Sequence, residues 1–224
     1  FTMKGMLWYQ GESNASHASD YGTSLKTMIQ QWRTLFQQPE LPFLIVQLPN
    51  LGRAEDQPKE SWWGEMRHQQ WLASSLPFVG LAVTWDIGDP DETHPRNKAD
   101  FASRLYQVAR ELAYHEPGPG SGPLPTDFAV DGHQLVITFS GIGKGLRTRN
   151  GDEPGGFAIK GTDGEFVWAH ATIKGNQVLV SHPDILAPVA VRFAWAMNPT
   201  TANLVNSRNL PATTFEWKKN EGTK

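Results

Sequence analysis

Apolar and polar residues are arranged along the first half of the chain as strands that are each followed by a helix. Three short apolar runs predict strands, and the first of them has the unbroken apolar character of a strand buried on both faces. These runs are residues 4–10, 42–49 and 80–86. Apolar residues at helical spacing predict helices over residues 21–37, with Asp20 as N-cap, and over 62–74 and 98–114. Three consecutive strand–helix units indicate a parallel sheet.

The pattern changes at residues 115–125, HEPGPGSGPLP, which contain too much glycine and proline for a helix or a strand. Beyond them, short strand-like runs alternate with Asp-Gly and Gly-Asn turns, which predicts a small antiparallel β-sandwich. We therefore expect an α/β domain over residues 1–114, a linker over 115–125 and a β-sandwich domain over 126–224. The glycine-rich stretch 141–156 is expected to be a mobile loop between strands, and its arginines are assigned no role.

Three parallel strands make a thin sheet, so the edge strand at residues 4–10 would be unpaired unless another segment joins it. We expect the domain to be truncated at its N-terminus. The first ten residues, FTMKGMLWYQ, lack the charged and apolar regions of a signal peptide.

Composition narrows the classes of function. A net charge of −3 and a pI near 6.2 give no basis for holding a nucleic-acid backbone, and no apolar run approaches a membrane span. Nine Trp and eleven Phe suggest stacking on sugar rings. With no cysteine and with seven scattered histidines, the sequence implies neither a metal nor another cofactor.

Two loops at the carboxyl ends of the predicted strands carry candidate chemistry, because these ends share one rim of a parallel sheet. The first, WYQGESN at residues 8–14, is dense in amide, carboxylate and hydroxyl groups, although a turn leading into the next helix would also use such residues. In the other, Asp91 stands three residues before His94. That carboxylate could orient the imidazole of a general base, although an acidic surface loop is the alternative.

WYQGESN, DIGD and HPRNK, in this order, resemble the later blocks of the sialate O-acetylesterase group within the SGNH hydrolases. The resemblance extends over YGTSLKTMIQQWR, LPFLIVQLPN and the tail VRFAWAMNPTTANLVNSRNLPATTF, and so over essentially the whole chain. It implies part of a flavodoxin-like SGNH-hydrolase sheet. It also implies a carboxylic ester hydrolase that removes O-acetyl groups from sialic acid or another acetylated glycan, in a periplasmic or extracellular setting.

The same resemblance assigns roles to individual residues. His94 would be the general base and Gln10 an oxyanion-hole donor, within an oxyanion and substrate-binding block formed by Gln10, Gly11, Glu12 and Asn14. Asp91 would orient His94. Asp89 is the second choice for this acid, and the remaining alternatives are Asp86 and Glu92.

The family's nucleophilic serine belongs to a GQSNM-like block that this sequence does not contain, and Ser13 lacks the surroundings of a nucleophile elbow. We therefore expect little activity from the chain alone. The serine would come from an N-terminal segment of the same enzyme, possibly as a separate chain, that pairs with the strand at residues 4–10. The rival class is a non-catalytic carbohydrate-binding or structural module.

Overall fold

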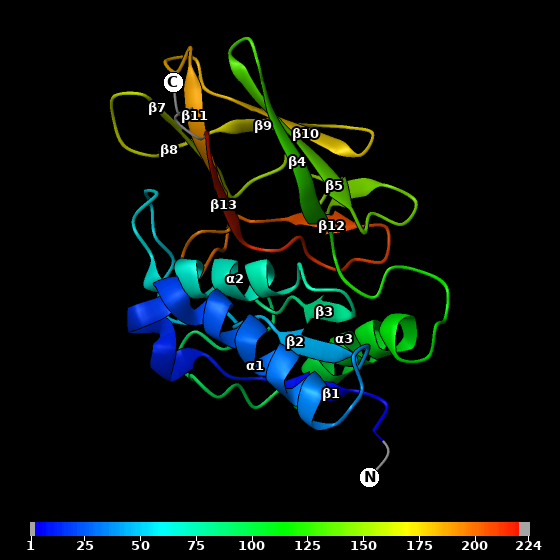
Figure 1. Cartoon of the computed structure of the whole chain (residues 1–224). Helices are drawn as coiled ribbons and strands as arrows, with labels where there is room; N and C mark the ends of the chain where they lie inside the picture. The colour runs from blue at the N-terminus through cyan, green and yellow to red at the C-terminus, as the bar shows by residue number, and fades with distance from the viewer. Residues whose placement is uncertain (1–2, 220–224) are drawn as a thin grey trace, which may run out of the picture.

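The structure is a computed structural model and describes residues 3–219. Its first half alternates strands and helices, as the lower part of Figure 1 shows. The elements are β1 (Met6–Trp8), the 3₁₀ helix η1 (Glu12–Asp20), α1 (Tyr21–Leu35), β2 (Phe43–Val46), α2 (Trp62–Ala73), β3 (Val79–Ala82) and α3 (Lys98–Leu112). The three predicted strand–helix units are therefore confirmed, whereas the loop expected after β1 is largely the 3₁₀ helix η1.

The three strands form one parallel sheet in the order β1-β2-β3. Alternate residues of the central strand β2 bury opposite faces, since Phe43 packs against Trp32 of α1 and Leu44 packs against Val108 of α3. At Gly80 on β3, a Cβ atom would lie 2.3 Å from the Val108 side chain. The missing side chain is thus what lets α3 pack closely on its face of the sheet.

The first strand differs from its prediction, because it is not buried on both faces. Leu7 in β1 is 66% exposed, while all four residues of β2 are buried. Within residues 3–219, β1 pairs only with β2 and is an edge of the sheet. An apolar strand with an open edge is unusual in a folded protein, because its free N–H and C=O groups invite pairing with another segment.

Side-chain caps begin two of the helices. Ser61 accepts the N–H of Gly64 at the start of α2, and Asn97 accepts the N–H of Asp100 at the start of α3. The predicted cap at Asp20 is wrong in detail. Asp20 precedes α1, but its side chain makes no capping hydrogen bond because η1 leads directly into α1 with helical backbone angles.

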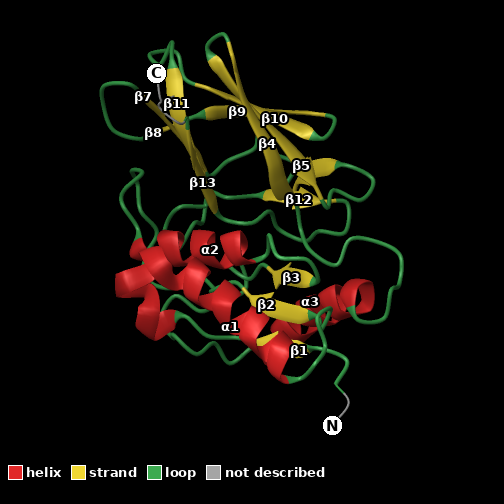
Figure 2. Cartoon of the chain, viewed as in Figure 1, coloured by secondary structure: helices red, strands yellow, loops and turns green. Residues whose placement is uncertain are grey.

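The second half consists of antiparallel strands, shown in yellow above the helices in Figure 2. Two four-stranded sheets have the orders β4-β5-β10-β9 and β13-β11-β7-β8, and β12 pairs with β6. The strands are β4 (Leu124–Asp131), β5 (Gln134–Ser140), β6 (Leu146–Thr148), β7 (Phe157–Gly161), β8 (Val167–Trp168), β9 (His170–Lys174), β10 (Gln177–Ser181), β11 (Pro188–Phe193), β12 (Leu204–Asn206) and β13 (Phe215–Lys218). The stretch expected to be a mobile loop contains β6, which local sequence does not reveal because its partner β12 lies far along the chain.

The two halves share one hydrophobic core, in which Met66 of α2 and Phe215 of β13 are both fully buried. Polar contacts also cross the junction, where Gln47 donates to Thr213 at 2.8 Å and the Trp85 indole donates to the Ala212 carbonyl at 2.8 Å. Within residues 115–125, a Cβ on Gly122 would lie 1.8 Å from the Pro211 carbonyl oxygen, so this segment packs tightly against the second half.

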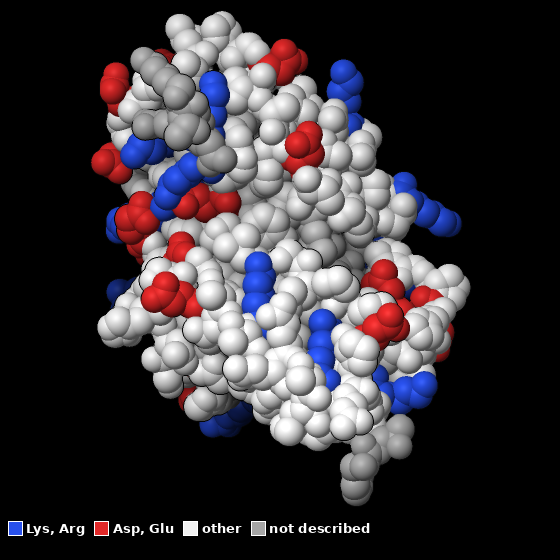
Figure 3. Space-filling model, viewed as in Figure 1, with Lys and Arg blue, Asp and Glu red and all other residues white. Residues whose placement is uncertain are grey.

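Charged side chains of both signs are distributed over the face shown in Figure 3, without a continuous basic surface. Over the described part of the chain, no helix combines the length and apolar character needed to cross a membrane.

Candidate active site

Three loops follow the carboxyl ends of β1, β2 and β3 and therefore share one edge of the parallel sheet. Open parallel sheets bind their ligands at this edge, because the loops there leave a crevice outside the strand ends. The candidate site residues from the sequence all lie in the first and third of these loops, and the second adds Asn50.

Gln10 is held with its amide in a defined orientation. The Tyr21 hydroxyl lies 2.9 Å from Oε1 and 3.0 Å from the backbone carbonyl oxygen of Gln10, while Gln10 Nε2 donates to Asn14 Oδ1 at 2.7 Å. An amide nitrogen carries two hydrogens, so Nε2 keeps one donor beyond its bond to Asn14. Burial of the Tyr21 hydroxyl raises its pKa, which keeps this partner protonated.

Gly11 allows a close approach between the first loop and α2. Its φ of 149° is rarely adopted by residues with a side chain, and a Cβ would lie 3.1 Å from Gln70 Nε2. That Gln70 nitrogen donates to the Gln10 carbonyl at 3.0 Å. The structure thus brings Gln10 and Asn14 together, and Gly11 between them is buried. Ser13 is exposed on η1.

His94 lies in the exposed part of the third loop, as does Asp91. Within residues 3–219, no hydrogen bond or ion pair joins their side chains. Asp89 Oδ1 instead accepts the backbone N–H of Asp91 at 3.0 Å, so this carboxylate shapes the loop. Glu92 is also exposed, and it forms an isolated antiparallel bridge with Asp89. The orienting role of Asp91 remains a prediction.

The third loop is connected to the first through the start of α3. Phe101 stacks on Tyr9 with ring centroids 5.5 Å apart, and the Lys98 ammonium lies 5.3 Å from both ring centroids. Tyr9 directly precedes Gln10, so these contacts place the helix that follows His94 against the loop that carries Gln10. Burial and then the nearby charge of Glu12 raise the pKa of Tyr9 to about 12.

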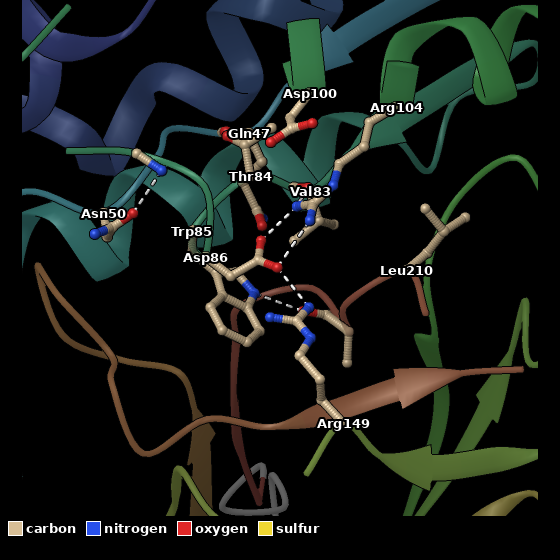
Figure 4. A network of polar contacts seen from close by, with 12 residues as sticks. Gln47, Asn50, Val83, Thr84, Trp85, Asp86, Asp100, Arg104, Arg149 and Leu210 are labelled. Carbon is tan, nitrogen blue, oxygen red and sulfur yellow. Dashed lines mark hydrogen bonds and ion pairs between the residues drawn. The ribbon is translucent and has the colours of Figure 1, made fainter. Parts of the chain in front are cut away.

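The Asp86 carboxylate forms ion pairs with two arginines, as Figure 4 shows. Arg104 of α3 binds both carboxylate oxygens and also donates to the Val83 carbonyl at 2.6 Å. Arg149, which directly follows β6 in the second half, donates to Oδ2 of the same carboxylate. Only 6% of the Asp86 side chain is exposed, so this alternative acid is committed to a structural ion-pair network.

The second loop forms an amide pair with the second half of the chain. Asn50 Nδ2 donates to Asn198 Oδ1 at 3.2 Å, while Asn50 Oδ1 accepts the N–H of Gly88 at 2.7 Å. Asn198 Nδ2 donates in turn to the Gly52 carbonyl at 2.8 Å. Asn50 directly follows the apolar run at residues 42–49, a position that could have identified it in the sequence, whereas no local signal identifies Arg149 or Asn198.

Comparison with known proteins identifies the family of the chain. A family model described as carbohydrate esterase, sialic acid-specific acetylesterase matches residues 2–108. The chain belongs to the sialate O-acetylesterase family. Human sialate O-acetylesterase is 32% identical over 156 residues, covering 62% of this chain and 30% of that protein. The mouse protein is 34% identical over 141 residues, covering 55% of this chain and 26% of that protein.

A likeness to a solved structure includes the second half of the chain as well. A crystal structure of a carbohydrate acetylesterase from Xanthomonas citri superposes with a TM-score of 0.91 and is 40% identical, over 97% of this chain. This chain covers 51% of that protein, and it spans 26–30% of the curated sialate O-acetylesterases.

Proposed function

We propose that the chain forms the histidine-bearing part of an SGNH-type esterase that removes O-acetyl groups from carbohydrate. The observation that carries this proposal is the contact of Tyr9, which precedes Gln10, with Lys98 and Phe101 at the start of the helix that follows the His94 loop. Membership of a carbohydrate acetylesterase family supports the same chemistry. The second half completes the proposed enzyme as a β-sandwich domain.

In the proposed reaction, a serine hydroxyl attacks the acetyl carbonyl while His94 takes its proton. The free hydrogen of Gln10 Nε2 would stabilise the oxyanion of the tetrahedral intermediate. His94 then returns the proton to the departing sugar oxygen, and water releases acetate from the acyl-enzyme by the same steps in turn. Asp91 would orient the imidazole, after a loop adjustment that brings its carboxylate to His94 Nδ1.

The serine in this scheme comes from a segment upstream of residue 1 that pairs with the free edge of β1. Support comes from the exposure of Leu7, 66%, and from the single strand partner of β1 within the described chain. Pairing there would bury Leu7 and satisfy the backbone groups of the open edge. If the added strand runs parallel to β1, its carboxyl end would also lie at the rim beside Gln10.

The test compares hydrolysis of p-nitrophenyl acetate by the chain alone and by the chain joined to its upstream segment, each with and without Ser13→Ala. We expect activity in the joined form only, and no effect of Ser13→Ala. Activity of the chain alone that Ser13→Ala abolishes would make Ser13 the nucleophile. Absence of activity in every form, together with retained glycan binding, would favour the carbohydrate-binding module.

A further inference from the structure

A hollow of about 320 Å³ lies where the rim of the parallel sheet meets the second half of the chain. The third rim loop contributes Asp86 and Pro90, and the second half contributes Arg149, Asn198 and Thr200. This volume lies at the lower end of the range for small-molecule sites, and domain junctions are a common place for such sites. Asp86 and Pro90 belong to the loop that also carries His94, so a ligand held here would contact the same loop as the proposed general base.

The walls of the hollow retain unused hydrogen-bonding capacity. Asn50 Nδ2 and Asn198 Nδ2 each use one hydrogen, so each amide has a second one without a partner in the described part of the chain. The Arg149 side chain makes one hydrogen bond to Asp86, and a guanidinium has five N–H groups in a planar fork. These groups can donate to hydroxyl oxygens of a ligand, while the amide oxygens of Asn50 and Asn198 can accept from its hydroxyl groups.

The charges that line the hollow are balanced. Asp86 and Arg149 are its charged lining residues, and they form an ion pair with each other. Arg104 lies behind Asp86 and is already engaged with that carboxylate and with the Val83 carbonyl (Figure 4). A ligand carboxylate bound to the unused N–H groups of Arg149 would lie beside the Asp86 carboxylate and be repelled by its like charge. A neutral ligand with several hydroxyl groups avoids this cost.

We propose that this hollow is a subsite for an uncharged sugar ring of the acetylated glycan. Arg149 and the amides of Asn50 and Asn198 would bind its hydroxyl groups, and the buried indole of Trp85 and the ring of Pro199 provide apolar wall. The proposal rests on the esterase function above and adds to it a substrate class, neutral acetylated glycan, and a specificity role for the second half of the chain.

The test uses the chain joined to its upstream segment and fills the hollow from its exposed rim. Thr200→Trp introduces a large ring at a lining position, and Thr201→Trp is the matched control at the adjacent exposed position, which does not line the hollow. Both variants are assayed on an acetylated neutral oligosaccharide and on p-nitrophenyl acetate. Because the small ester has no sugar, the kcat/KM for the oligosaccharide divided by that for p-nitrophenyl acetate measures the contribution of sugar binding in the hollow.

We expect Thr200→Trp to lower this ratio by at least about tenfold, since loss of one or two charge-assisted hydrogen bonds is worth that much. Thr201→Trp should leave it within about twofold, a change too small to represent a lost hydrogen bond. Equal ratios in the two variants would overturn the subsite.

A second variant, Arg149→Gln, removes the charge while Arg104 still pairs with Asp86. We expect KM for the neutral oligosaccharide to rise with little change in kcat. If KM rises only for an acetylated sialoside and not for the neutral oligosaccharide, the hollow is a carboxylate site and the neutral-sugar assignment is wrong. If no form hydrolyses any ester, titration calorimetry with the deacetylated oligosaccharide still separates Thr200→Trp from its control, so failure of the esterase function and failure of the subsite are distinguishable.

Discussion

Replacement of Arg67 by methionine should destabilise the contact between the two halves of the chain. Arg67 lies on α2 and is fully buried, and within residues 3–219 no carboxylate pairs with it. It donates to the Met197 carbonyl at 2.8 Å, closely to the Ala196 carbonyl, and more weakly to the Ala194 carbonyl and the Thr214 hydroxyl at 3.4 Å. Burial lowers the pKa of this guanidinium to about 9.

The expected cost follows from the groups that lose their donor. Two well-placed carbonyls left unsatisfied cost roughly 2 kcal/mol each, and removal of a desolvated charge returns roughly 1 kcal/mol, which leaves a net loss of about 3 kcal/mol. The thioether side chain of methionine has a length similar to that of the arginine stem, so the cavity contribution is small.

Urea unfolding followed by tryptophan fluorescence measures this loss as a change in the free energy of unfolding. Arg110→Met is the matched control, because Arg110 is on the surface of α3 in an exposed pair with Glu116 and its replacement should leave stability close to that of the parent. A loss below about 1 kcal/mol for Arg67→Met would refute the reasoning, because it would mean that water or local rearrangement satisfies the freed carbonyls.

Three further changes test local parts of the structure. Burial lowers the pKa of His68 to about 4, so below about pH 6.5 the unfolded chain binds a proton that the folded chain does not bind. The free energy of unfolding should therefore fall by up to roughly 3 kcal/mol between pH 6.5 and 4. His68→Asn should flatten this pH dependence in urea titrations, and an unchanged slope would contradict it. Gly11→Ala should cost about 2 kcal/mol through strain at positive φ and should displace the Gln70 amide, visible as an altered side-chain NMR signal. Ser61→Ala should lower the free energy of unfolding by about 1 kcal/mol, because α2 loses its N-cap. Calorimetry measures this loss, and a smaller value would mean that water replaces the serine hydroxyl.

Elements governed by local pattern could be predicted from the sequence. The unbroken apolar run at β2 and the alternation at β5 and β10 reflect burial on two faces and on alternate residues, and the structure places strands there. The open edge at β1 could also be anticipated, because three parallel strands make a thin sheet. The exposure of Leu7 could not, since burial of an edge strand depends on whichever segment lies beside it.

Elements governed by distant partners could not be predicted. The strand β6 is a three-residue run in a glycine-rich stretch and exists because β12 pairs with it. The same pairing brings Arg149 to Asp86 across 63 residues, which removes Asp86 from the set of free acids. The sequence placed Gln10 and Asn14 in one block, and their hydrogen bond is present, but the tyrosine that orients Gln10 belongs to the following helix.

The most direct measurement of the proposed chemistry is acetate release from an acetylated oligosaccharide by the chain joined to its upstream segment, with and without His94→Ala. A general base in a serine triad contributes several orders of magnitude, so kcat should fall by about 10⁴-fold or more in the variant while its thermal unfolding stays close to that of the parent. A variant that keeps more than about a tenth of the parent rate would contradict the assignment, because a loss below tenfold is smaller than general-base catalysis provides.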